Sequence, residues 1–170
     1  MRRLTLLFAL LSLAPALLYA QTPAPTPAQA PTAICPPTPT LDALIAALDA
    51  AITGPASKDR TCFRQIFVPS ARLIPIRATG PSVLTVDDWI AAVQKNGDEI
   101  VTEHQLKYQS ETFGRIAHIW STYSTTLAGK PVARGINSIQ AVYDGQNWHI
   151  VEILWQAENP ATPIPAPYLP

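Results

Sequence analysis

The sequence predicts an α+β domain in which three helices precede a long antiparallel sheet and pack on one of its faces. The first observation is that apolar residues recur at helical spacing in three segments between residues 41 and 96. The second is that the apolar pattern changes to a period of two after Gly97 and keeps it to about residue 158. Helical and extended segments that are separated along the chain are typical of α+β architecture.

Each predicted helix begins next to a side chain that can cap it. Helices are predicted over residues 41–52, 58–67 and 86–95. Thr40, Ser57 and Thr85 precede them, and hydroxyl oxygens accept hydrogen bonds from the first free N–H groups of a helix. Asp87 and Asp88 add negative charge at the positive end of the third helix dipole.

The strands are predicted from period-two patterns and the turns between them. Residues 71–76 are expected to form a short strand at a sheet edge, because Pro75 cannot donate a ladder hydrogen bond. Four longer strands are predicted near residues 99–110, 115–126, 133–143 and 148–158. Their connections centre on Phe113-Gly114, Gly129-Lys130 and Asp144-Gly145, and such short turns predict an antiparallel meander.

The ends of the chain predict export. Residues 1–20 combine two arginines, an apolar stretch too short for a retained anchor and a final small residue, which is the pattern of a signal peptide cleaved near Ala20. Residues 21–40 contain seven prolines and no charge, which predicts an extended tether. We therefore expect a periplasmic or secreted protein with one domain at residues 41–159, followed by a proline-rich C-terminal arm at 160–170. The alternative for the arm is a disordered tail.

Charge and cysteine content argue against several classes of function. Loss of Arg2 and Arg3 with the signal peptide leaves a net charge of about −2, so no basic footprint for nucleic acid or membranes remains. Cys35 and Cys62 are expected to form a disulfide, since export favours it. No Cys-x-x-Cys, Cys/His cluster or phosphate loop is present, so neither a metal nor a cofactor is predicted.

Several strings in the second half of the chain resemble a known family. They are Phe113–Tyr123, Gly129–Pro131, Arg134–Gln140, Asp144-Gly145, Trp148, Trp155–Glu158, Pro163–Pro165 and Tyr168-Leu169. With the order of elements, they resemble the nuclear transport factor 2-like superfamily, which includes SnoaL-like and ketosteroid isomerase-like cones. Within it, the chain is most similar to an exported bacterial group without an assigned activity. That group often has a glutamate where this chain has Ser124.

The resemblance covers residues 41–170 and implies a curved sheet wrapped around helices, with a pocket at the open end of the cone. The superfamily contains isomerases, cyclases, dehydratases and binding modules, so the fold leaves the function open. Our leading hypothesis is an exported domain that binds a small hydrophobic or anionic ligand. The alternatives are an isomerase, dehydratase or cyclase acting on a small hydrophobic carbonyl compound, and a structural interaction module.

Strand parity predicts which side chains face the pocket, if all three hairpin loops are even in length. The polar side of the first long strand, from Glu103 to Gln109, is expected to face water, which selects the opposite face as the inner one. That face carries seven candidates: His104, Tyr108, Tyr123, Arg134, Ser138, Gln140 and Trp155. His104 could accept a proton beside Tyr123, and Arg134 could hold an anionic group. The alternative is that these groups bond one another or lie exposed at strand ends. No mid-strand aspartate lies on this face, so the carboxylate base of ketosteroid isomerase has no counterpart there.

The opposite face carries an apolar patch in this assignment. Its members are Trp120, Ile139, Ala141, Ile150 and Leu154. Exposed patches of this kind mark partner surfaces, and the resemblance implies a homodimer formed through this side. A bulge would invert the parity, in which case this face is the core and His118, Asn137 and Glu152 line the pocket.

Overall fold

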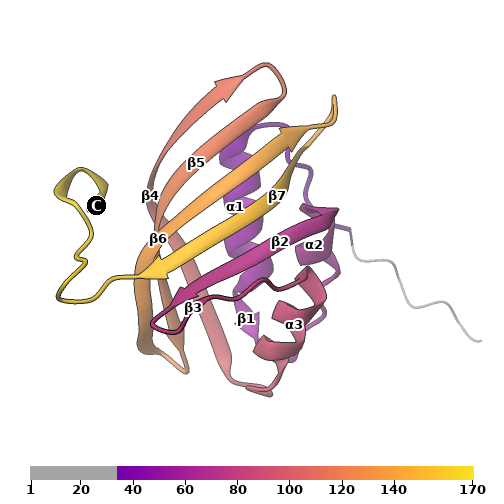
Figure 1. Cartoon of the computed structure of the whole chain (residues 1–170). Helices are drawn as coiled ribbons and strands as arrows, with labels where there is room; N and C mark the ends of the chain where they lie inside the picture. Colours follow the sequence, from indigo (N-terminus) through magenta and orange to yellow (C-terminus); the bar gives the residue numbers. More distant parts are fainter. Residues whose placement is uncertain (1–33) are drawn as a thin grey trace, which may run out of the picture. The chain divides into compact units, whose positions relative to one another are not determined.

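The structure is a computed structural model that describes residues 34–170; the predicted signal peptide, its cleavage site and most of the tether lie outside the described residues. Figure 1 shows three helices and a strongly curved sheet. The helices are α1 (Leu41–Ile52), α2 (Thr61–Gln65) and α3 (Val86–Gln94), and a 3-10 turn, η1, spans Ala166–Tyr168. The strands are β1 (Gly54–Pro55), β2 (Phe67–Arg77), β3 (Gly80–Pro81), β4 (Ile100–Phe113), β5 (Ile116–Leu127), β6 (Lys130–Tyr143) and β7 (Trp148–Ala157). Within this part of the chain, no helix is long and apolar enough to cross a membrane.

The sheet has seven strands in the order β1-β4-β5-β6-β7-β2-β3. The predicted meander is confirmed, because β4 to β7 pair consecutively and antiparallel. Strand β2 is longer than the predicted 71–76 and is not an edge, since it pairs parallel to β7 on one side and with the short β3 on the other. The carbonyl of Pro75 accepts the N–H of Ser82 in the segment that follows β3.

The caps of α1 and α3 are confirmed, whereas α2 is shorter than predicted. The Thr40 hydroxyl accepts the N–H of Ala43, and Thr85 and Asp88 form a reciprocal capping box at the start of α3. Ser57 caps no helix, because its hydroxyl donates to Asp98 at 2.6 Å. The chain then turns through Asp59 before α2 begins, and β2 follows directly.

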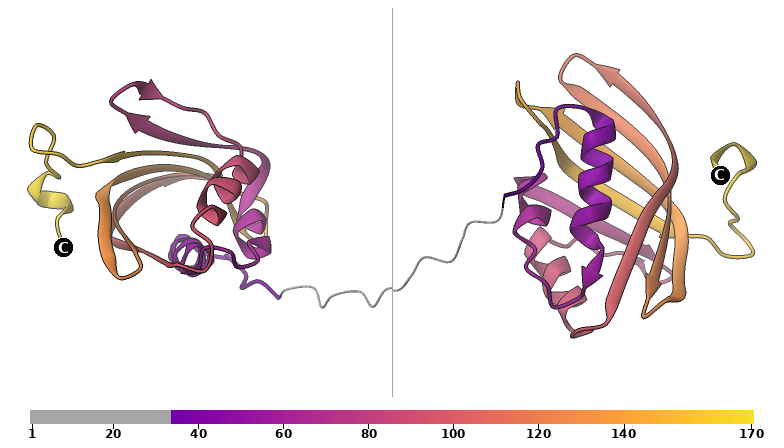
Figure 2. Two further views of the ribbon diagram at one scale, coloured as in Figure 1. Left: turned by 90° about the horizontal axis from the view of Figure 1, so that it is seen from below. Right: turned by 180° about the vertical axis from the view of Figure 1, so that it is seen from behind.

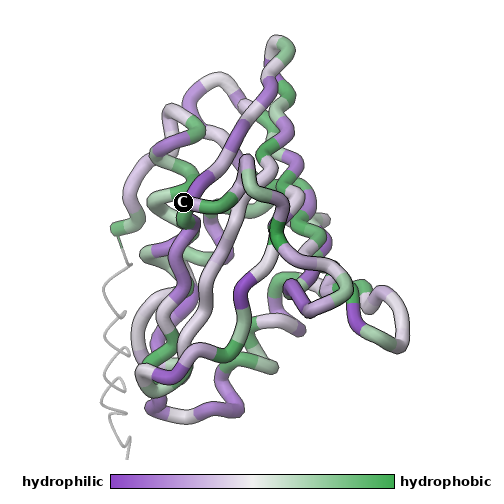
Figure 3. The backbone as a smooth tube through the Cα atoms, turned by 90° about the vertical axis from the view of Figure 1, so that its left-hand side faces the viewer, coloured by the Kyte–Doolittle hydropathy of each residue, from purple (hydrophilic) through white to green (hydrophobic). Residues whose placement is uncertain are grey.

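The helices lie on the concave side of the sheet (Figure 2), and the core forms between them. Leu44 and Leu48 of α1 are fully buried, as are Ile119, Ile139 and Ile150 of the sheet. Hydrophilic and hydrophobic residues alternate along the strands (Figure 3), which is the pattern of a sheet with one buried face. Burial of each large aliphatic side chain stabilises the domain by roughly 2 kcal/mol.

Each hairpin of the meander contains a β-bulge. The extra residues are Leu106 in β4, Val132 in β6 and Val151 in β7, and all three side chains are exposed. A bulge moves the alternation by one residue, so inward positions change parity beyond it. The three hairpin loops are even in length, as assumed, but the bulges make the predicted facing wrong for most of β6, for residues 101–105 of β4 and for the start of β7.

The predicted outer patch is corrected by this register. Ile139, Ala141 and Ile150 are core residues, and only Trp120 and Leu154 of the five remain on the convex side. The alternative, in which a bulge brings His118, Asn137 and Glu152 to the pocket, is right for Asn137, which is buried on the concave side. It is wrong for His118 and Glu152, which do not line the cavity. The homodimer expected through the convex side stays a prediction.

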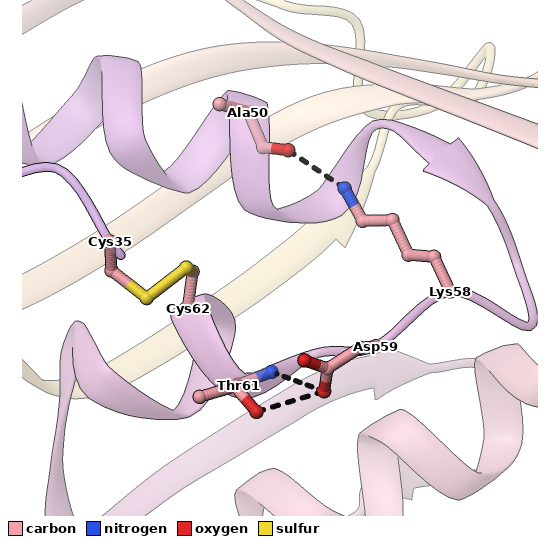
Figure 4. The surroundings of a disulfide bond; sticks show 6 residues. All are labelled: Cys35, Ala50, Lys58, Asp59, Thr61 and Cys62. Atoms are coloured by element: carbon pink, nitrogen blue, oxygen red, sulfur yellow. Dashed lines mark hydrogen bonds between the residues drawn. A yellow bond between two sulfur atoms is a disulfide. The ribbon is translucent and has the colours of Figure 1, made fainter. Parts of the chain in front are cut away.

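Both ends of the described chain are tied to the domain. The predicted disulfide between Cys35 and Cys62 is present (Figure 4), and Thr38 continues the attachment by pairing with Trp148 through backbone and side chain. At the other end, the arm runs along the convex side of the sheet. Thr122 donates to the carbonyl of Tyr168 at 2.6 Å, and Ile164 of the arm is buried.

Candidate functional site

The concave side of the sheet encloses a cavity of about 290 Å³ next to the β5–β6 hairpin. Its walls are mostly apolar and come from helices and strands alike. They include Leu48, Ile52, Trp89, Val93, Val101, Leu127 and Trp155. A cavity with this lining suits a small apolar molecule, with orientation left to a few polar groups.

Most polar groups of the cavity belong to the sheet and lie around Glu103; Asn96, which follows α3, is a further one. This carboxyl group is partly exposed and lines the cavity together with Tyr123 and Asn137. Its Oε2 accepts a hydrogen bond from the Thr125 hydroxyl at 2.8 Å, and its Oε1 accepts one from the Gln105 amide at 3.3 Å. Glu103 is therefore held by its neighbours from two sides.

Gln105 connects Glu103 to the next two strands. Its Oε1 accepts from the hydroxyl of Ser121 at 2.6 Å and from the amide of Asn137 at 3.1 Å. Because both of these donors bond the same oxygen, the amide nitrogen of Gln105 is directed to Glu103. A continuous hydrogen-bonded network thus crosses β4, β5 and β6 on the concave face, and it fixes the side chains that the cavity presents.

Burial sets the protonation of the two ionisable groups at this wall. Burial raises the pKa of Glu103 from 4.5 to about 7, with the charge of Asp49 adding to the rise and the bonds from Thr125 and Gln105 opposing it. Burial, together with the charge of Glu103, raises the pKa of Tyr123 to about 12. Near neutral pH, Glu103 can therefore donate or accept a proton, whereas the Tyr123 hydroxyl remains a donor.

The structure brings only two of the seven predicted site residues to the cavity. Tyr123 and Trp155 line it. Tyr108 also faces inward, but its hydroxyl donates to Asp42 and it lies outside the cavity lining.

The other four predicted site residues lie on the other side of the sheet. The His104 side chain is 62% exposed, and Arg134 forms an ion pair with Glu158. Ser138 contacts His118, and Gln140 is exposed. The bulges at Leu106 and Val132 are the reason, because they reverse the alternation on the segments that carry these residues.

Sequence reasoning missed Glu103, Gln105 and Thr125. The row of polar residues in β4 predicts a solvent face, whereas Glu103 and Gln105 are half-buried and bonded to partners on the concave side. The signal for this was the series Ser121, Tyr123 and Thr125 on the neighbouring strand, which supplies the hydroxyl donors that a buried carboxyl group needs. Among residues 34–170, no group of three His, Cys, Asp or Glu side chains could hold a metal ion.

No protein-family model matches the chain, and no curated protein matches it in sequence. Solved structures do match. An NTF-2 like protein of unknown function from Silicibacter pomeroyi is 18% identical, with 69% of this chain and 92% of that chain covered and a TM-score of 0.51. An NTF-2 like protein of unknown function from Shewanella baltica is 11% identical, with coverage of 68% and 89% and a TM-score of 0.50.

The chain has the nuclear transport factor 2-like fold. A protein from Kribbella flavida is similar as well, at 12% identity, with coverage of 68% and 86% and a TM-score of 0.55. Structural similarity at sequence identities this low shows the nuclear transport factor 2-like fold but no activity. The function must therefore be argued from the residues at the cavity.

Proposed function

We propose that this domain binds a small, mostly apolar molecule that carries one hydroxyl or carbonyl group. The observation that carries the proposal is Glu103, a carboxyl group that ionises near pH 7 and lies at the wall of an apolar cavity. In its protonated form it donates a hydrogen bond to a carbonyl oxygen, and in its ionised form it accepts one from a hydroxyl. Tyr123 supplies a second donor beside it.

The volume and lining support a compact ring system rather than a long chain. A cavity of about 290 Å³ is near the lower limit for binding sites of small molecules. Trp89 and Trp155 offer flat aromatic walls, and apart from Asn96 the polar lining residues come from strands β4, β5 and β6. A ligand with a single polar substituent matches that distribution, because a second polar group would be buried against apolar side chains at a cost of several kcal/mol.

The test uses two probes that differ in one group, 2-naphthol and 2-methylnaphthalene. Titration of each into isotope-labelled protein should shift the backbone resonances of Glu103, Tyr123 and Thr125, and 2-naphthol should bind more tightly. Ala133→Phe places a ring in the cavity and should abolish both titrations, whereas Glu111→Gln, an exposed change on the strand that carries Glu103, should leave them intact. Equal shifts in Ala133→Phe and the unaltered protein would refute the site.

A second function, proton transfer, is favoured by the same carboxyl group. A general acid or base works best when its pKa lies near the working pH, and burial brings Glu103 to about 7. Ionised Glu103 would take a proton from the carbon next to a ketone carbonyl, while Tyr123 donates a hydrogen bond to the oxygen that becomes negative. Protonated Glu103 would then return the proton to the far carbon of the shifted double bond, which completes an isomerisation. This role replaces the one predicted for His104.

Isomerisation of cyclohex-3-enone to the conjugated ketone tests this second function. The rate should rise with pH through about 7, because the base is the ionised carboxyl group. It should vanish in Glu103→Gln and persist in His104→Ala. A rate equal to that of buffer at every pH would leave ligand binding as the function that the site supports.

We also propose that the domain works outside the cytoplasm, as the signal-peptide pattern predicts. The Cys35–Cys62 disulfide supports this location, because disulfides persist in oxidising compartments. N-terminal sequencing of the protein recovered from the periplasm or medium should begin at Gln21. Recovery of the chain with Met1 intact in the cytoplasm would contradict the proposal.

A further inference from the structure

The free edge of β4 is held by side chains of α1. Strand β1 pairs with only the first two residues of β4, so the N–H and C=O groups farther along that edge need other partners. The Thr53 hydroxyl accepts the N–H of Glu103 at 3.2 Å and donates to the carbonyl of the same residue at 3.3 Å. One helical turn earlier, Asp49 accepts the N–H of Gln105 with both carboxylate oxygens, at 3.0 and 3.2 Å. The helix thus continues the pairing that β1 begins.

The bond from Asp49 lies at the bulge that decides which residues face the cavity. Gln105 is the last residue before the extra Leu106, and β4 changes its register on β5 at this point. Tyr108 faces inward on the other side of the bulge. Uninterrupted alternation from Tyr108 would turn His104 inward and Glu103 outward. With the bulge, Glu103 and Gln105 face inward, and His104 is exposed.

We propose that Asp49 is a positioning residue for the cavity: it holds the β4 bulge so that Glu103, rather than His104, faces the ligand, and it keeps a second negative charge behind Glu103. The inference rests on the proposed role of Glu103 at the binding site. Asp49 itself is not among the residues that line the cavity, so it acts on the ligand only through β4.

Each carboxyl group of the pair Asp49 and Glu103 has ionisable neighbours that the structure identifies. Asp49 faces His104, whose Nδ1 lies 3.9 Å from its Oδ2, and burial raises the pKa of Asp49 while the N–H of Gln105 lowers it. Glu103 is faced by Tyr123 from β5 and by the charge of Asp49 from α1. Because that charge adds to the rise in the pKa of Glu103, its removal should lower this pKa.

Two substitutions separate the geometric role of Asp49 from its charge. Asp49→Asn keeps one oxygen that can accept the N–H of Gln105 but has no charge, whereas Asp49→Ala removes both. Asp42→Asn is the matched control, because Asp42 belongs to the same helix and bonds a side chain of β4 rather than its backbone. All measurements use the full domain without ligand: carbon-detected NMR titration of Glu103, cross-strand contacts between β4 and β5, and broadening of His104 by a soluble paramagnetic agent.

We expect Asp49→Asn to retain the contacts between Gln105 and Tyr123 and to lower the pKa of Glu103 from about 7 toward its ordinary value of 4.5. Asp49→Ala should lose those contacts and shield His104 from the paramagnetic agent. Asp42→Asn should change neither. An unaltered Glu103 titration in Asp49→Asn would overturn the inference even if Asp49→Ala fails to fold. Because no ligand is present, failure of the naphthol titrations would refute the binding site without affecting this result.

Discussion

Replacement of Glu103 by glutamine is expected to stabilise the domain at neutral and alkaline pH. In the folded protein Glu103 ionises at about 7, whereas in the unfolded chain it ionises near 4.5. Between these values the folded state retains a proton that the unfolded state has released, so stability falls as pH rises through this window. The difference of about 2.5 units corresponds to about 3 kcal/mol, which is fully lost above the folded pKa.

Glutamine removes this loss and can keep the surrounding hydrogen bonds. Its Oε1 can accept from the Gln105 amide as Glu103 does, and its Nε2 can donate to Thr125, whose hydroxyl then accepts. The substitution therefore changes the charge with little change of shape. Substitution by alanine would mix this effect with a new cavity and two lost hydrogen bonds.

Urea denaturation between pH 4.5 and 9 measures the difference. The free energy of unfolding of the unaltered protein should fall relative to that of Glu103→Gln by about 3 kcal/mol across the window, with its midpoint near pH 6. Glu111→Gln provides the control, since this exposed carboxyl group lies on the same strand. Parallel profiles for Glu103→Gln and the unaltered protein would refute the proposed protonation of the cavity wall.

Three further results are expected. Cys35→Ser with Cys62→Ser should lower the free energy of unfolding by about 3 to 4 kcal/mol, because it opens a closed loop of 27 residues; equal urea midpoints with and without reductant would contradict this. Gly135→Ala should cost roughly 1 to 3 kcal/mol or more in thermal unfolding, because a Cβ there would lie 2.0 Å from the carbonyl oxygen of Gln156; an unchanged Tm would show that the strands can separate locally. Deletion of residues 160–170 uncovers Trp120 and the convex side of the sheet, so sedimentation velocity should detect more self-association than for the full chain at the same concentration; unchanged sedimentation would contradict a shielding role for the arm.

The order of elements was predictable from sequence because it depends on local signals. Capping by Thr40 and Thr85 and the short turns of the meander act over a few residues, and the structure confirms them. The short strands β1 and β3 and the parallel pairing of β2 with β7 were not predictable. They depend on contacts between residues that are far apart in the chain, such as Leu73 with Ile153.

The site was harder to predict than the fold because a single bulge changes which residues face the cavity along the rest of the strand. Glu103 and His104 are adjacent in the sequence, and only the insertion of Leu106 decides which of them reaches the cavity. Alternation alone carries no record of that insertion. At each bulge of this sheet the inserted residue is an exposed apolar side chain in an otherwise alternating strand, namely Leu106, Val132 or Val151.

A count of hydrogen-bond partners would have discriminated between the two faces where hydrophobicity did not. The strand β4 carries polar residues on both sides, so polarity alone does not identify the side that faces water. Burial of Glu103 and Gln105 is nevertheless possible because Ser121, Thr125 and Asn137 satisfy them from the neighbouring strands. A polar side chain is therefore buried where its neighbours can bond it, and in this domain that condition selects the carboxyl group that gives the cavity its chemistry.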